Sequence, residues 1–347
     1  MASKGFTQRA LIGSICISLM LLVGCSSKAV APAASAQKKA PHWITQPPQQ
    51  IGMAYGLGSM EIYGNPADAV KRATDLAKVD LVSQLKVTVA GNFSQSTTEA
   101  SGTNQATQVQ QNVSQYVSSQ IPAAELDEVQ VSETWVDEKL AYVLVELDRQ
   151  KAAARLRRDI TDLDTELLDV AQQQPQGNKL QQLQPLLPAL KLFAQRDALA
   201  ERLALVSVER RGAALPAELK ALQNRIYQQI DELVVALEFT NSAAKQLEGN
   251  LLEALTAQGL RIQQNQAADL TFAVSAKQTQ KQQGGNYYAF VDTQVVIKDS
   301  QQRVLNAFSK QAKGVSGMGN MAQQKAAIET AKLITNELAV TLADKLR

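Results

Sequence analysis

Apolar positions follow a helical period over most of this chain and alternate with polar ones in several shorter segments. Residues 54–59 alternate and contain two glycines, which predicts a short strand that another backbone approaches closely. Asn65 and Pro66 then supply an N-cap and a first helical residue. The apolar stripe of this helix consists of Ala69, Val70, Ala73, Leu76, Ala77 and Leu81. Alanine on the stripe and glycine in the strand predict a helix lying close to a sheet.

Two polar residues, Asp80 and Gln84, fall on the same helical stripe. They either have partners or mark the point where the helix leaves the core. The apolar residues Leu85, Val87 and Val89 alternate. This alternation favours the second interpretation and predicts a strand from about Leu85.

A polar segment, residues 92–120, contains few apolar side chains. It is typical of a long polar β hairpin or of a loop that orders on a partner. The solvated β hairpin is the favoured interpretation. Two further strands are expected over residues 126–136 and 141–147, joined by a turn at 137–139.

Residues 149–231 have helical periodicity, broken near Gly177 and between Gly212 and Pro216, and predict a helical arm or bundle. A strand at 233–239 and a helix ending at Gly259 follow it. Three more strands (269–276, 287–297 and 303–308) and a final helix from about Met321 complete the pattern. We therefore expect an α+β protein with two small β-α-β-β-β-α domains joined by the helical arm or bundle.

The N-terminus has the pattern of an export signal. Lys4 and Arg9 precede an apolar run, residues 10–23, that is too short to span a bilayer as a helix. Leu22-Val23-Gly24-Cys25 resembles the lipobox of bacterial lipoproteins, in which the cysteine is acylated and becomes the first mature residue. The resemblance to such lipoproteins, with Ser26 rather than Asp after the cysteine, implies the periplasmic face of the outer membrane. Residues 26–40 have too little apolar surface to fold and predict a flexible tether.

These patterns predict five segments along the chain. They are a lipoprotein signal peptide (1–24), the lipidated Cys25 with its tether (25–40), an α+β domain (41–150), the helical arm (151–231) and a C-terminal α+β domain (232–347).

Composition restricts the chemistry. Cys16 lies in the signal and Cys25 is the acylation site, so no thiol remains for a disulfide, a metal or a nucleophile. Without the signal, the 35 basic residues fall by two and balance the 33 acidic ones, which argues against nucleic-acid binding. The only histidine, His42, lacks triad partners, and Asp137 and Asp148 lie at strand ends, where Asp serves turns. We expect no enzyme, cofactor or metal.

Several short motifs carry a family resemblance. They are Pro41-x-Trp43, Tyr55-Gly56-x-Gly58-Ser59, the helix through Leu81 and Leu85, Trp135-Val136-Asp137, and the strand from Ala141 to Asp148. Over about residues 41–150 the chain resembles the Lpp-twenty family of outer-membrane lipoproteins. The resemblance implies no catalytic residue, and some relatives are flagellar assembly lipoproteins that build or stabilise rings around the basal body.

The resulting prediction is a non-enzymatic, lipid-anchored (palmitate-bearing) periplasmic protein that acts as a scaffold or assembly factor for an envelope structure, such as a flagellar basal-body ring. Trp135 and Tyr142 are the candidate partner contacts, although aromatic residues on strands more often belong to the core. Strand addition at a sheet edge, within residues 92–120, is one available binding mode. The alternatives are a regulator that binds a penicillin-binding protein, a homo-oligomeric structural lipoprotein and, last, a wall-modifying enzyme.

Overall fold

The computed structural model describes residues 39–93, 107–121, 126–263 and 268–345, and the side chains of 87–93 and 345 are not part of that description. Cys25 and the predicted signal and tether up to residue 38 lie outside the described residues. The structure is α+β with two separate sheets, as predicted. None of the described helices is both long enough and apolar enough to cross a membrane.

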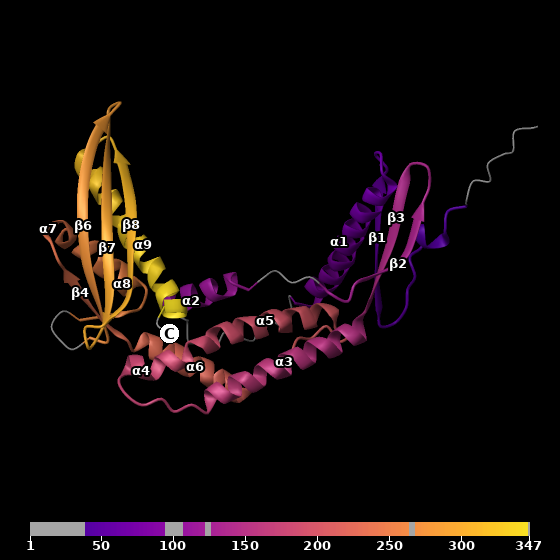
Figure 1. Ribbon diagram of the computed structural model, residues 1–347, viewed down its shortest axis with the longest axis horizontal. Helices are drawn as coiled ribbons and strands as arrows, with labels where there is room; N and C mark the ends of the chain where they lie inside the picture. Colours follow the sequence, from indigo (N-terminus) through magenta and orange to yellow (C-terminus); the bar gives the residue numbers. More distant parts are fainter. Residues whose placement is uncertain (1–38, 94–106, 122–125, 264–267, 346–347) are drawn as a thin grey trace, which may run out of the picture. The chain divides into compact units, whose positions relative to one another are not determined.

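The first sheet has the order β1-β3-β2 and is antiparallel throughout. Its strands are β1 (Met53–Glu61), β2 (Gln130–Val136) and β3 (Leu140–Asp148), and η1 (His42–Ile44) precedes them. The helix α1 (Pro66–Phe93) packs on one face of this sheet (Figure 1). The predicted close approach is confirmed at both glycines. A Cβ on Gly56 would lie 2.2 Å from the Ala77 carbonyl oxygen, and one on Gly58 2.0 Å from that of Ala73.

The predicted change from helix to strand at Leu85 is wrong, because α1 continues to Phe93. Asp80 has partners instead: its Oδ2 accepts hydrogen bonds from the Leu57 backbone N–H at 2.9 Å and from Gln84 Nε2 at 2.8 Å. Leu85 is buried in the same core as Leu81. The polar residues on the stripe therefore form hydrogen bonds within the helix–sheet packing, so the helix does not have to leave the core at this point.

The favoured prediction of a β hairpin in residues 92–120 is also wrong for the residues of this segment that the structure describes. Residues Gln108–Ser119 form the helix α2, with Thr107 as N-cap. Val109, Val113 and Val117, four residues apart, form its buried face. Residues 94–106 lie outside the described residues. Among the described residues, the first sheet therefore has three strands rather than the four that a β-α-β-β-β-α order requires.

The helices that follow are α3 (Arg149–Ala171), α4 (Lys179–Leu183), the short η2 (Gln184–Leu186), α5 (Pro188–Val206) and α6 (Ala217–Asp231). Their buried Arg196 donates from Nε to Asp164 Oδ1 on α3 at 2.7 Å. It also donates to the Ala213 and Ala214 carbonyl oxygens at 3.2 and 2.7 Å. One side chain thus joins α3, α5 and the loop before α6.

The second sheet has the order β5-β4-β6-β7-β8. Its strands are β4 (Val234–Phe239), β5 (Arg261–Ile262), β6 (Leu270–Gln283), β7 (Asn286–Asp299) and β8 (Val304–Ser316). The short β5 is one strand more than predicted. The helices α8 (Glu248–Ala257) and α9 (Gly319–Val340) share a core with one face of the sheet, α7 (Ser242–Lys245) contacts β6, and the short η3 (Thr341–Lys345) ends the described chain. A Cβ on Gly314 would lie 1.9 Å from the Ala322 carbonyl oxygen, so glycine again permits close helix packing.

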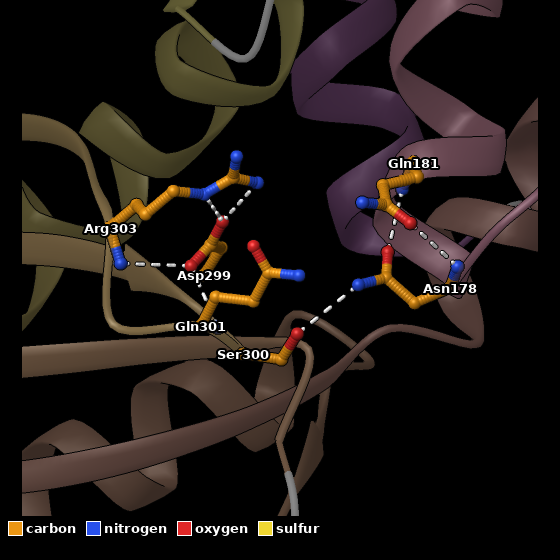
Figure 2. Close-up of polar contacts among 6 residues, drawn as sticks. All are labelled: Asn178, Gln181, Asp299, Ser300, Gln301 and Arg303. Atoms are coloured by element: carbon orange, nitrogen blue, oxygen red, sulfur yellow. Dashed lines mark hydrogen bonds and ion pairs between the residues drawn. The ribbon is translucent and has the colours of Figure 1, made fainter.

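The turn between β7 and β8 is built around the buried Asp299, shown in Figure 2. Its carboxylate accepts the backbone N–H groups of Gln301 and Arg303 at 2.8 and 2.9 Å, and Arg303 Nε at 2.7 Å. Burial opposes ionisation, but these donors hold the pKa of Asp299 below its ordinary value. In the same turn Ser300 Oγ receives a hydrogen bond from Asn178 Nδ2 at 3.1 Å, which connects the N-cap of α4 to the second sheet.

Candidate functional site

The two sequence-predicted contact residues, Trp135 and Tyr142, lie side by side on the first sheet. They are directly opposite each other on β2 and β3, with ring centroids 5.6 Å apart and ring planes tilted by 47°. Their neighbours Val143 and Val145 point to the other face, where they share the core with α1. The aromatic pair therefore lies on the face turned away from α1, and both rings are half-buried.

Carboxylates surround the aromatic pair. Glu146 shares the face of Tyr142 because it follows it by four residues on β3. Glu61 and Glu133 lie on the same face, since their cross-strand partners, Leu140 and Leu144, are each two residues from Tyr142. None of the three strands contains a lysine or arginine. We call this surface, made of Glu61, Glu133, Trp135, Tyr142 and Glu146, the acidic aromatic face.

A short segment covers part of this face. Leu144 is almost fully buried although it points away from α1, and η1 contacts β3. We attribute the burial of Leu144 to η1, in which Trp43 and Ile44 are half-buried. Trp135 and Tyr142 remain partly accessible beside it.

The edges of the first sheet are poorly suited to strand addition. On β1, the Leu57 N–H already donates to Asp80 of α1. On β2, the register shifts between Val131 and Glu133, and such a bulge interrupts an edge ladder. The described part of the polar segment is the helix α2, so it offers no strand for the predicted edge pairing.

The acids considered for catalysis have structural partners. Asp137 accepts the backbone N–H groups of Leu140 and Lys139 at 2.6 and 2.7 Å, and these hydrogen bonds hold its pKa below the ordinary value. Asp148 is the N-cap of α3 and accepts the Lys151 N–H at 3.0 Å. His42 is exposed in η1. Within the described residues, no three His, Cys, Asp or Glu side chains are grouped as metal ligands would be.

The sequence reasoning missed a second open surface, on the second sheet. Lys277, Lys281, Tyr288, Phe290 and Lys313 point away from α8 and α9, and we call them the basic aromatic face. The ammonium group of Lys313 lies 4.9 Å from the Tyr288 ring centroid and 5.9 Å from that of Phe290. The sequence feature that could have revealed this surface is the alternation in residues 277–281 and 288–292. Alternation shows that these residues share a face of the sheet, but it does not show which face the helices cover.

Comparisons with solved structures give only distant similarities. The secreted protein HP1454 from Helicobacter pylori is 16% identical and has a TM-score of 0.45, covering 84% of this chain and 99% of that one. A minor lipoprotein from Acinetobacter baumannii is 16% identical, with a TM-score of 0.27, over 31% of this chain and 91% of that one. The PelC dodecamer from Paraburkholderia phytofirmans is 13% identical, with a TM-score of 0.24, over 32% and 87%. At these scores the similarities carry no argument about function.

No curated protein sequence matches this chain. A family model, however, covers the part that carries the first sheet and α1, and its match ends at Asp148, within two residues of the predicted end. The resemblance read from the motifs between Pro41 and Asp148 is therefore confirmed, and residues 41–148 match the LPP20 lipoprotein family.

Proposed function

We propose that this protein is a non-enzymatic scaffold or assembly factor of the bacterial envelope, anchored to the outer membrane through acylated Cys25. The match of residues 41–148 to a lipoprotein family supports the anchor, and the lipobox-like Leu22-Val23-Gly24-Cys25 supplies the acceptor. Each acyl chain contributes about 0.8 kcal/mol per buried methylene to membrane binding.

The observation that carries the scaffold role is the open Trp135–Tyr142 pair on the acidic aromatic face. Large aromatic rings that keep one side accessible are frequent anchors of protein interfaces. The first proposed partner is a component of an envelope assembly, such as a flagellar basal-body ring. Some relatives in this family are flagellar assembly lipoproteins that build or stabilise such rings. The two acids considered for catalysis, Asp137 and Asp148, accept hydrogen bonds in a turn and a helix cap, which supports binding rather than catalysis.

The anchor is tested by Cys25→Ala, with Cys16→Ala as the matched control because Cys16 is the only other cysteine and lies in the predicted signal. We expect Cys25→Ala to abolish metabolic labelling with palmitate and to move the protein from the membrane to the periplasmic fraction. Cys16→Ala should do neither. Unchanged labelling and fractionation of Cys25→Ala would remove the basis of the proposed anchor.

The scaffold role is tested by a photo-crosslinking residue at the exposed Ser59, which lies opposite Tyr142 on β1. The control carries the same residue at Lys78, exposed on α1. We expect Ser59 to capture basal-body ring proteins, and Trp135→Ala to reduce that yield at least about tenfold, as for a hot-spot residue. Capture of a penicillin-binding protein would favour the regulator instead. Equal capture from both positions would rule out this face as the contact.

A further inference from the structure

The basic aromatic face lies on the side of the second sheet that α8 and α9 leave open. On the covered side, Val291, Val295 and Ile297 of β7 are buried in the core with both helices. The outward residues alternate with them: Tyr288, Phe290, Asp292 and Gln294 are half-buried or exposed. Their cross-strand neighbours on β6 and β8 point outward as well.

Charge is unevenly distributed over this outward side. Near β4, Lys298 pairs with Glu238 at 3.7 Å, and at mid-sheet Asp292 accepts a hydrogen bond from Gln311 at 2.5 Å. Lys277 lies directly opposite Asp292, and Lys281 and Lys313 lie nearer the β6–β7 turn. All three lysines are exposed and form no ion pair with any carboxylate of the described residues. With Asp292 as the carboxylate beside them, the three lysines still leave a positive balance around Tyr288 and Phe290.

We infer that the basic aromatic face binds the acidic aromatic face of a second copy of this chain. Three lysines around two aromatic rings would meet three glutamates around Trp135 and Tyr142. Both surfaces lie on antiparallel strands, β1-β3-β2 in the first sheet and β6-β7-β8 in the second, and sheets pack face to face at about 10 Å. Complementary charge steers such an encounter and fixes its register.

A contact between two different faces is heterologous. Each copy keeps one face free after binding, so the contact adds copies head to tail and gives a ring if it closes or a filament if it does not. The inference deepens the proposed function and rests on it, because the same acidic aromatic face is involved. Because exposed charges are screened beyond about 10 Å at 0.1 M salt, the association should weaken as salt is raised.

The test uses two charge-reversal variants of the full chain in sedimentation velocity over a range of concentrations. One carries Lys277→Glu, Lys281→Glu and Lys313→Glu, and the other Glu61→Lys, Glu133→Lys and Glu146→Lys. Each alone should weaken self-association at least about tenfold, since like charges then oppose each other across the contact. An equimolar mixture of the two should associate again, because each reversed face then meets a complementary one. The control carries Lys71→Glu, Lys191→Glu and Lys220→Glu, at exposed positions on helices, and should associate like the wild type.

The inference would be overturned if both variants self-associated as strongly as the wild type. It would also be overturned if their mixture associated no more strongly than either variant alone. So would a loss of binding to phosphatidylglycerol vesicles in the lysine variant with self-association unchanged, because the lysines would then serve an anionic surface. Circular dichroism of each variant separates these results from misfolding. If self-association fails while the residue at Ser59 still captures an envelope protein, the proposed function stands and only this inference falls.

Discussion

At the scale of single residues, glycine sets the distance between helix and sheet in both halves of the structure. Gly56 and Gly58 lie under Ala77 and Ala73 of α1, and Gly314 lies under Ala322 of α9. In each case an added Cβ would lie within 2.2 Å of a helix carbonyl oxygen, and backbone atoms cannot rotate away as a side chain can. The helices can therefore pack closely only where strand and helix both lack bulk.

Gly58→Ala should lower the free energy of unfolding by about 2 kcal/mol or more, the upper range for overpacked cores, because α1 must move away from β1. Urea denaturation measures the change. The control is Gly249→Ala on α8, where a Cβ meets nothing within 4 Å and the helix should gain about 0.5–1 kcal/mol. Equal stability of Gly58→Ala and the wild type would show that α1 does not lie this close.

At the scale of elements, the helical arm depends on one buried cation. Arg196 is 2% exposed, and it donates to groups of other segments: Asp164 on α3 and the two carbonyl oxygens before α6. Desolvating a guanidinium is costly unless its donors are satisfied, so these contacts define how the helices meet. The periodicity of α5 places position 196 on the buried face, but it does not identify the groups that accept hydrogen bonds from Arg196.

Arg196→Met should destabilise the protein by about 3 kcal/mol, the lower end for breaking a buried pair, since Asp164 keeps some solvent contact. Combining it with Asp164→Leu should recover part of that loss, because the unpaired carboxylate is then removed. Thermal and urea unfolding of both variants measure the effect, and Lys191→Met, exposed on α5, is the control. A single variant as stable as the wild type would mean that the buried pair adds nothing.

At the scale of the whole molecule, segments far apart in sequence complete each other's cores. The helix α2 follows α1 in sequence, yet Val109, Val113 and Val117 pack with residues of α5, α9 and η3. Polar contacts follow the same pattern: Thr107 donates to Asp231 at 2.8 Å, Asn112 to Gln258 at 2.7 Å, and Tyr116 to Asp344 at 2.6 Å. The helices α3 and α5 each contribute to both cores.

The Tyr116 contact predicts a pH dependence. Its hydrogen bond to Asp344, with burial and the nearby carboxylate charges, raises the pKa of the phenol from 10.0 to about 12. The protonated phenol is the form that the fold favours. Its contribution to stability is therefore complete below pH 10 and is lost as the pH rises from about 10 to 12.

Asp344→Asn should lower the pKa of Tyr116 toward 10.0 and reduce this loss of stability. Because the chain has seven tyrosines, the titration is read as the tyrosinate absorbance difference between each protein and its Tyr116→Phe counterpart. Asp68→Asn, exposed in the first turn of α1, should leave it unchanged. A Tyr116 pKa that does not respond to Asp344→Asn would contradict the contact.

The sequence by itself determined the features that depend on near neighbours. Helical periods and alternation located most elements within a few residues, and the Gly-x-Gly strand with an alanine-rich helix predicted their close packing. The motifs from Pro41 to Asp148 indicated the family whose model matches residues 41–148, and Trp135 and Tyr142 were singled out together. These features repeat every two to four residues or lie within one motif, so a local pattern is enough to show them.

Only the tertiary structure decided what depends on distant partners. Asp80 stays on the packed stripe because Leu57, 23 residues earlier, supplies a donor, and α2 buries its three valines against helices that follow it by many residues. Alternation likewise shows which residues share a sheet face, but which face α1, α8 or α9 covers is set by chain topology. A polar residue or an open face takes its meaning from what packs against it, and that neighbour is not encoded in the local sequence.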